Sequence, residues 1–523
     1  MVSSSVPVPR HLLERLPPGA RAVDAATSRA TFARADGKPS AGPVTERVAN
    51  PCAAGAAPDW FELEYSVDAE LEARIREILT RDASGLGIAL VMDPATGQLL
   101  AYVADDPERL PADRAYPMAS LVKVVTAAAL LRQVPEASGW RCRFAGSPWE
   151  LRAGQLEPPA AGGRWQSFRQ ALAISNNQCF ARLAVHELGE ARLREEARRL
   201  GLLEAPAWGH PPGRLASAAT PLALGELGSG LSGSHLSPLA AVQLAATLAR
   251  GERVMPRWLT RVRDARGAWL ALPEPPTPRQ VWSPALARRL REALVEVTRR
   301  GTAARGFRGP HGAARLAGVE VAGTTGSLRG EQPPGLYQWF IGVAPAEAPR
   351  VALAVLRVSE GRGGGSASAQ AAAILQALFC RGGSCAGAHV EVQLARRAKH
   401  NEQLATEWRH EQARAQAGAA RADARRRALL EAAELDRIPQ PVGGSKLELP
   451  HDLRRQQAEG EIVLLVELDP AGQVLAVEIE SSELPGFERL VASQVRAWSF
   501  TPPTLHGRPV HARARLPIAI RVR

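Results

Sequence analysis

Two residues that could form a covalent acyl intermediate stand three positions apart in the run MASLVKVVTAAALL at 118–131. Ser120 and Lys123 would lie on one face of a helix, within a single turn. Nearly every residue after Lys123 is apolar, so we expect burial to lower the pKa of its amine. A neutral amine can accept the proton of the Ser120 hydroxyl and so create a nucleophile.

Arginine cannot replace Lys123 in this role, because a guanidinium stays protonated. The chain has 65 Lys and Arg residues, of which only four are lysines. A lysine at position 123 is therefore consistent with a residue that must accept a proton. The alternative is an N-capping serine followed by a structural lysine, and the short S-x-x-K pattern alone does not decide between the two.

A second polar pair, Ser175 and Asn177, occurs in the sequence AISNNQ. A hydroxyl in a tight loop can relay a proton between a lysine amine and a leaving group. The amide of Asn177 can hold a substrate carbonyl. Ser-Asn-Asn is also a common helix-capping string, so this pair alone is a weak indication.

The third segment, VAGTTGS at 321–327, reads as a strand with glycines. A strand edge beside a nucleophile can donate a backbone N–H to a tetrahedral oxyanion and pair with an extended peptide. Gly323 and Gly326 would let that backbone approach closely. Taken alone, the segment is equally an ordinary glycine-bearing strand.

The elements that must position these residues follow an α+β plan. We expect a helix at 71–79 and a β-hairpin formed by 87–92 and 98–103 around the turn DPATG. Late strands are expected at 339–343 and 351–358. An antiparallel sheet built from both ends, flanked by helices and joined to an all-helical subdomain, is the predicted fold class.

The length of 523 residues favours two to four domains, and 45% hydrophobic residues exclude wholesale disorder. We expect no transmembrane helix, because no run approaches about 18 apolar residues. The N-terminus lacks the pattern of a signal peptide. The net charge of +12 permits attraction to anionic polymers, but no signature of a nucleic-acid-binding fold accompanies it.

The expected domains are a flexible Pro/Ala/Ser-rich lead-in (1–58), the α+β domain (59–388), a charged helical linker (389–438) and a small α/β domain (439–523). The five cysteines show no metal-ligand spacing, so neither metal nor cofactor is expected. A short disulfide could close the loop between Cys380 and Cys385. Whether Cys142 pairs with Cys179 stays open at this point.

The three motifs, in this order, resemble the penicillin-binding serine D,D-transpeptidase family, whose motifs are S-x-x-K, S-x-N and K-[ST]-G. The resemblance covers roughly residues 60–380. It implies that Ser120 is the acylated nucleophile and Lys123 the base, with Ser175 and Asn177 completing the proton relay and binding the substrate amide. The remaining site residues that it implies line the substrate groove and the oxyanion hole: Thr324, Thr325, Gly326 and Ser327.

One position departs from that family. Thr324 stands where the third motif begins with Lys, which supplies positive charge for the substrate carboxylate. A charge-assisted hydrogen bond contributes about 1.5–3 kcal/mol, against about 1 kcal/mol for a neutral one. We therefore expect acylation to be slower, or substrate binding to be weaker, by a factor on the order of ten or more. Arg329 is a candidate source of the missing charge.

The last 80 or so residues resemble the C-terminal domain of TonB-type energy transducers. The matching segments are 460–463, 469–474, 480–482, 495–503 and 507–510. The resemblance implies a small α/β fold that binds an envelope protein partner by strand pairing. The alternative is a structural domain that only packs or dimerises.

Together the resemblances imply a periplasmic enzyme that acts on peptidoglycan stem peptides and is inhibited by β-lactams. No polymerising glycosyltransferase domain is expected before residue 60. The alternative function is a catalytically weakened peptidoglycan or β-lactam sensor, coupled to a partner through the TonB-like domain. Ser120, Lys123, Ser175 and Asn177 favour the enzyme, whereas Thr324 and the appended domain favour the sensor.

Overall fold

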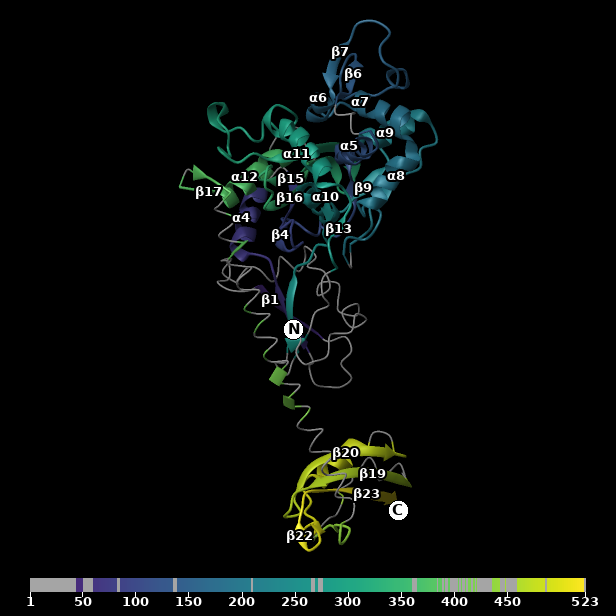
Figure 1. Cartoon of the computed structure of the whole chain (residues 1–523), viewed down its shortest axis with the longest axis vertical. Coiled ribbons are helices and arrows are strands. Elements are labelled where there is room, and N and C mark those ends of the chain that lie inside the picture. Colours follow the sequence, from purple (N-terminus) through teal and green to yellow (C-terminus); the bar gives the residue numbers. More distant parts are fainter. Residues whose placement is uncertain are drawn as a thin grey trace. The chain divides into compact units, whose positions relative to one another are not determined.

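A computed structural model gives the fold of the chain, which divides into two compact units, Met1–Arg409 and His410–Arg523 (Figure 1). The structure describes the following residues: 44–49, 60–81, 85–134, 139–207, 210–264, 269–270, 276–359, 365–382, 384–387, 435–442, 459–484 and 487–521, with isolated positions between 390 and 447. The expected lead-in and charged helical linker lie mostly outside these residues.

A five-stranded antiparallel sheet is the centre of the first unit. Its strand order is β14-β15-β16-β3-β4. The strands are β14 (Ala322–Glu331), β15 (Pro334–Ala344), β16 (Val351–Ser359), β3 (Gly85–Met92) and β4 (Leu99–Ala104). Early and late segments therefore share one sheet, which confirms the predicted fold class.

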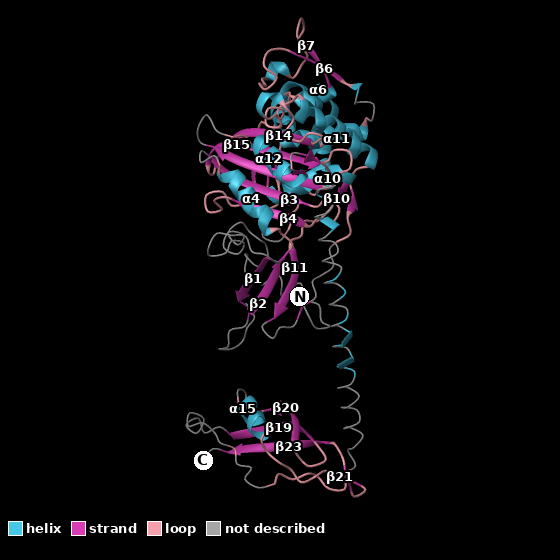
Figure 2. Cartoon of the chain, turned by 90° about the vertical axis from the view of Figure 1, so that its left-hand side faces the viewer, coloured by secondary structure: helices cyan, strands magenta, loops and turns pink. Residues whose placement is uncertain are grey.

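Helices cover both faces of this sheet (Figure 2). All nine residues of β16 are buried, as expected for a strand with packing on each side. One helix pair, α4 and α12, packs together and against the sheet, and a second pair, α10 and α11, does the same. Their bounds are α4 (Ala69–Thr80), α12 (Ala367–Phe379), α10 (Pro238–Arg250) and α11 (Pro284–Arg299).

The segment between β4 and α10 forms the helical subdomain. Its helices are α5 (Val122–Gln133), α6 (Phe168–Ala173), α7 (Asn177–Arg182), a π-helical turn (Leu183–Leu188), α8 (Gly189–Arg199) and α9 (Pro221–Ser229). A small hairpin, β6 (Arg141–Phe144) with β7 (Arg164–Ser167), interrupts the helices. The subdomain was expected to be all-helical, but it also contains this hairpin. The two strands carry mostly polar residues, so the sequence shows no hydrophobic strand pattern there.

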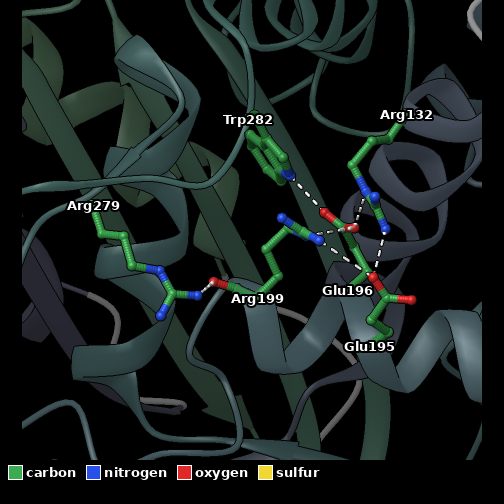
Figure 3. A network of polar contacts seen from close by, with 6 residues as sticks. All are labelled: Arg132, Glu195, Glu196, Arg199, Arg279 and Trp282. Atoms are coloured by element: carbon green, nitrogen blue, oxygen red, sulfur yellow. Dashed lines mark hydrogen bonds and ion pairs between the residues drawn. The ribbon is translucent and has the colours of Figure 1, made fainter.

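A buried carboxylate fixes the C-terminal end of α5 (Figure 3). Glu196 of α8 is completely buried and accepts hydrogen bonds from Arg132 Nε at 2.8 Å and from Trp282 Nε1 at 2.6 Å. Its neighbour Glu195 accepts hydrogen bonds from Arg132 at 3.1 Å and from Arg199 at 3.3 Å. Because α5 begins just after Ser120, this network helps to hold the helix that positions the candidate nucleophile.

We expect Glu196→Ala to lower the free energy of unfolding of the first unit by about 1–3 kcal/mol, because it leaves the buried Trp282 N–H without an acceptor and removes one of the two carboxylates that pair with Arg132. The matched control is Glu195→Ala, whose side chain is half exposed and whose loss is expected to have a much smaller effect. Urea unfolding monitored by tryptophan fluorescence measures both. Equal effects of the two variants would show that burial of Glu196 is not what stabilises α5.

The expected lead-in at 1–58 is wrong for part of its length. Residues Val44–Ala49 form β1, which pairs with β2 (Trp60–Tyr65) from Val44 opposite Tyr65 to Ala49 opposite Trp60. The pairing gives this backbone hydrogen-bond partners that composition alone did not reveal. The order of this sheet is β1-β2-β11-β12, with β11 at Leu259–Asp264 and β12 at Trp269–Leu270.

The second unit contains a three-stranded antiparallel sheet of order β20-β19-β23. Its elements are β19 (Glu459–Leu468), β20 (Val474–Ser482), α15 (Glu488–Val495) and β23 (Ala512–Arg521). Alternate residues of β19, from Ile462 to Leu468, are buried in its core. These elements form a small α/β fold, as the resemblance of this region implied.

Two disulfides stabilise the first unit. One joins Cys380 to Cys385 and closes a short loop, and the other joins Cys142 of β6 to Cys179 of α7. The second pairing, which the sequence left open, connects the hairpin to the helix that carries Asn177. Among the described helices, none is both long and apolar enough to cross a membrane.

Candidate active site

Ser120 lies in a single 3₁₀ turn, Ala119–Leu121, directly before α5. The preceding residue, Ala119, has a φ of 50°, which is a strained value for a residue other than glycine. Two contacts hold this turn in place: Met118 N donates to Ser234 O at 2.9 Å, and Trp339 Nε1 donates to Pro117 O at 2.8 Å. The hydroxyl is therefore presented at the N-terminal end of a buried helix, as the sequence predicted.

Lys123 is one helical turn further on and is 1% exposed. Its Nζ contacts Ser120 Oγ at 2.8 Å, Asn177 Oδ1 at 2.7 Å and Ser229 O at 2.5 Å. Burial away from water disfavours the ammonium form and lowers the pKa of Lys123 to about 7. The amine is therefore present in both protonation states near neutral pH.

The acceptor set fixes where the lone pair of the neutral amine points. Asn177 Oδ1 and the Ser229 carbonyl oxygen only accept hydrogen bonds, so they take the two N–H bonds of a neutral amine. The third contact, to Ser120 Oγ, is then left for the lone pair, with the serine O–H as donor. This arrangement has the geometry that a general base needs.

The S-x-N segment forms the loop between α6 and α7. Ser175 has a φ of 57° and is buried, and Asn176 caps α7 by accepting a hydrogen bond from Cys179 N at 3.1 Å. Asn177, by contrast, points to the site and also donates from Nδ2 to Trp149 O at 2.6 Å. The structure thus joins Asn177 to Ser120 and Lys123, and among the described residues Ser175 has no direct hydrogen bond to these three.

The edge strand β14 passes beside the serine turn. A Cβ built on Gly326 would lie 3.2 Å from Ala119 Cβ and 3.3 Å from Ser120 N, so glycine is needed for this approach. Alternation along the strand places Thr324 on the same side as this missing Cβ. Thr325 and the exposed Ser327 point to the other side.

Thr324 is 3% exposed and lies on the side of β14 that approaches the nucleophile turn. Its hydroxyl can donate one hydrogen bond but supplies no charge. Arg329 lies on the opposite side of the strand, exposed, and makes no ion pair with any residue that the structure describes. Because it shares its face with Thr325 and Ser327, it lies on the other side of the strand from Thr324 and not at the position of the missing lysine.

Three residues contribute to the site although the sequence did not indicate them: Ser229, Thr302 and Trp149. The Ser229 carbonyl, at the C-terminus of α9, accepts from Lys123, and Thr302 Oγ1 contacts Thr325 Oγ1 at 2.5 Å. Trp149 flanks the S-x-N loop, with its indole N–H donating to Ile174 O at 2.9 Å. The glycine after Ser229 signalled a helix end, but nothing in the sequence indicated that its carbonyl faces a lysine.

Among the described residues, no group of three or more His, Cys, Asp or Glu side chains could hold a metal ion. The fold and the cluster around Lys123 are those of an α+β domain that places a serine hydroxyl beside a buried lysine amine. The model of the penicillin binding protein transpeptidase domain matches residues 87–378, more than half of the chain. The chain belongs to this family, and the model of the Gram-negative bacterial TonB protein C-terminal domain matches residues 445–521.

Curated relatives are named peptidoglycan D,D-transpeptidase PbpA. The protein from Mycolicibacterium smegmatis is 29% identical over 316 residues, 52% of this chain and 61% of the relative. The Mycobacterium tuberculosis protein is 29% identical over 315 residues, with the same shares. The chain thus spans about three fifths of the length of these relatives.

Solved structures show the same fold. PBPA from Mycobacterium tuberculosis has a TM-score of 0.50 at 23% identity, covering 60% of this chain and 81% of that chain. PBP2 from Pseudomonas aeruginosa, in complex with WCK 5153, has a TM-score of 0.51 at 23% identity, covering 63% and 81%.

Proposed function

We propose that this protein is a penicillin-binding serine acyltransferase that acts on peptidoglycan stem peptides through an acyl-enzyme on Ser120. The observation that carries the proposal is the position of Lys123 Nζ between Ser120 Oγ, Asn177 Oδ1 and Ser229 O. A buried amine with a pKa of about 7 can act as the base for that hydroxyl at neutral pH. The names of the curated relatives support the same reaction class.

In the proposed acylation, Ser120 Oγ attacks the carbonyl of the terminal D-Ala-D-Ala amide while its proton passes to Lys123 Nζ. The backbone N–H groups of Ser120 and Ser327 stabilise the oxyanion. The C–N bond then breaks, and the proton is transferred to the departing amine through Ser175. An acceptor amine or water next attacks the ester. With a β-lactam the ring opens and no leaving group departs, so the adduct persists.

A second candidate is a peptidoglycan or β-lactam sensor with weakened turnover. Thr324 favours it, because the uncharged side chain binds a substrate carboxylate less strongly. The TonB-like domain also favours it, since such a module would report to an envelope protein partner. Both candidates place the protein in the periplasm, and both have a transpeptidase region followed by a TonB-like module.

The test is intact-protein mass after incubation with benzylpenicillin, followed by peptide mapping of the adduct. We expect a mass increase of one ligand, located on the peptide that contains Ser120. An adduct that persists for hours supports an acyltransferase or sensor, and turnover of a D-Ala-D-Ala peptide then supports the enzyme over the sensor. The absence of any adduct at high concentration and long times would refute the proposed nucleophile.

Thr324→Lys is expected to accelerate acylation by benzylpenicillin about tenfold or more, because it restores a cation for the ligand carboxylate. The matched control is Thr324→Met, which has similar length without charge. Stopped-time mass spectrometry gives the acylation rate, and thermal unfolding verifies that both variants fold. If Thr324→Lys acylates no faster than the wild type, the missing charge does not limit activity.

A further inference from the structure

The β6–β7 hairpin forms a basic surface with an exposed tryptophan. Its two strands contain three arginines and no carboxylate: Arg141, Arg143 and Arg164. Trp165 pairs opposite Arg143 and is 56% exposed, which is unusual for so large an apolar side chain. In Figure 1 the hairpin lies beyond α6 and α7, at one end of the first unit.

The two arginines of β6 lie over the tryptophan ring, which is still 56% exposed. The guanidinium carbons of Arg141 and Arg143 lie 5.5 and 5.7 Å from the centre of the Trp165 ring. Cation–π attraction at these distances restrains the ring and places positive charge beside it. The result is an exposed apolar ring with positive charge against it.

The hairpin is attached rigidly to the candidate active site. The Cys142–Cys179 disulfide joins β6 to α7, and Asn176 Nδ2 donates to Gln166 Oε1 at 2.9 Å. Asn177, the first residue of α7, contacts Lys123. A ligand on the hairpin is therefore held at a fixed distance from Ser120.

A second exposed indole lies between the hairpin and the site. Trp149 is 60% exposed, and its ring N–H donates to Ile174 O, next to Ser175. It follows Arg143 by six residues, so an extended chain would separate the two by at most about 20 Å. One extended ligand can therefore contact both indoles close to the loop that carries Ser175.

We propose that the β6–β7 hairpin is a binding site for uncrosslinked peptidoglycan strands, separate from the acylation site. A sugar ring packs on the exposed face of Trp165, and a stem-peptide carboxylate pairs with Arg141. The indole supplies apolar area for the sugar ring to cover, and the adjacent arginines complement the carboxylates. This inference rests on the proposed function for the identity of the polymer, but the binding it describes needs no turnover.

The experiment uses the full chain carrying Ser120→Ala, so that peptidoglycan strands are bound but not consumed. Fluorescence anisotropy of labelled soluble peptidoglycan strands measures the Kd of their complex with the protein. We expect Trp165→Ala and Arg141→Ala each to weaken binding at least fivefold. The matched control, Arg198→Ala, removes an exposed arginine from α8 and is expected to change Kd less than twofold. In the protein with Ser120 intact, Trp165→Ala leaves the benzylpenicillin acylation rate within twofold.

Unchanged strand binding in Trp165→Ala would overturn the proposal. So would displacement of the strands by polyglutamate at equal carboxylate concentration, because charge alone would then explain binding. Acylation of the wild type without strand binding refutes the hairpin site and leaves the proposed function standing. A fourth outcome is that peptidoglycan strands bind in a Trp165-dependent way but no β-lactam acylates the protein. That outcome supports the hairpin site and refutes the proposed enzyme.

Discussion

Ser120→Ala is expected to abolish the covalent β-lactam adduct completely. The hydroxyl is the group that Lys123 Nζ contacts at 2.8 Å, and alanine offers no atom that could form the ester. The β-lactam ring then stays closed, so the mass of the protein stays unchanged at any concentration. Intact-protein mass spectrometry measures this, with the wild type treated in parallel.

The matched control is Ser175→Ala, which removes a nearby serine of the same polar segment. Because Ser175 is proposed to relay a proton and not to form the ester, this variant is expected to slow acylation and still give the adduct. An adduct that survives in Ser120→Ala, or disappears only in Ser175→Ala, would move the nucleophile to another residue. Reversible binding of benzylpenicillin to Ser120→Ala, measured by calorimetry, verifies that the groove is intact.

The sequence predicted those parts of the site in which chemistry restricts the residue type. The S-x-x-K pattern alone did not exclude a capping serine and a structural lysine, but the structure places Ser120 Oγ and Lys123 Nζ in contact. Gly326 was expected to permit a close approach, and β14 does pass within contact of the serine turn there. The sheet was predictable because strands such as β3, β4 and β16 are short, largely apolar runs.

The parts of the site and of the fold that could not be predicted depend on backbone groups and on contacts between segments far apart in the sequence. Any residue can provide the carbonyl that Ser229 offers to Lys123, so residue type carries no signal. The contact of Thr302 with Thr325 joins the end of α11 to β14, and only the fold brings these together. The strand at Val44–Ala49 was missed for the same reason, because its partner β2 supplies the hydrogen bonds.

Lys123→Arg is expected to slow acylation by about 10²–10⁴-fold, the usual contribution of a general base. Arginine keeps the positive charge and the donors but cannot accept the serine proton. Since Lys123 is fully buried and the larger guanidinium could disturb packing, Lys123→Ala serves as a second variant. It leaves a cavity beside Ser120 that a small primary amine can enter. We expect methylamine to restore part of the acylation rate in Lys123→Ala and none in Ser120→Ala.

The pH profile separates a base from a merely structural lysine. Acylation needs the neutral amine, so with a pKa of about 7 the rate rises with pH, reaches half its maximum near pH 7 and levels off above about pH 8. An unburied lysine would be neutral in only about 0.03% of molecules at pH 7, so its profile would rise steadily to pH 10. Lys123→Ala with methylamine should shift the midpoint toward the pKa of the added amine. If the acylation rate of the wild type does not change between pH 5 and 9, Lys123 is not the base. This holds whatever effect substitutions of Lys123 have on the acylation rate.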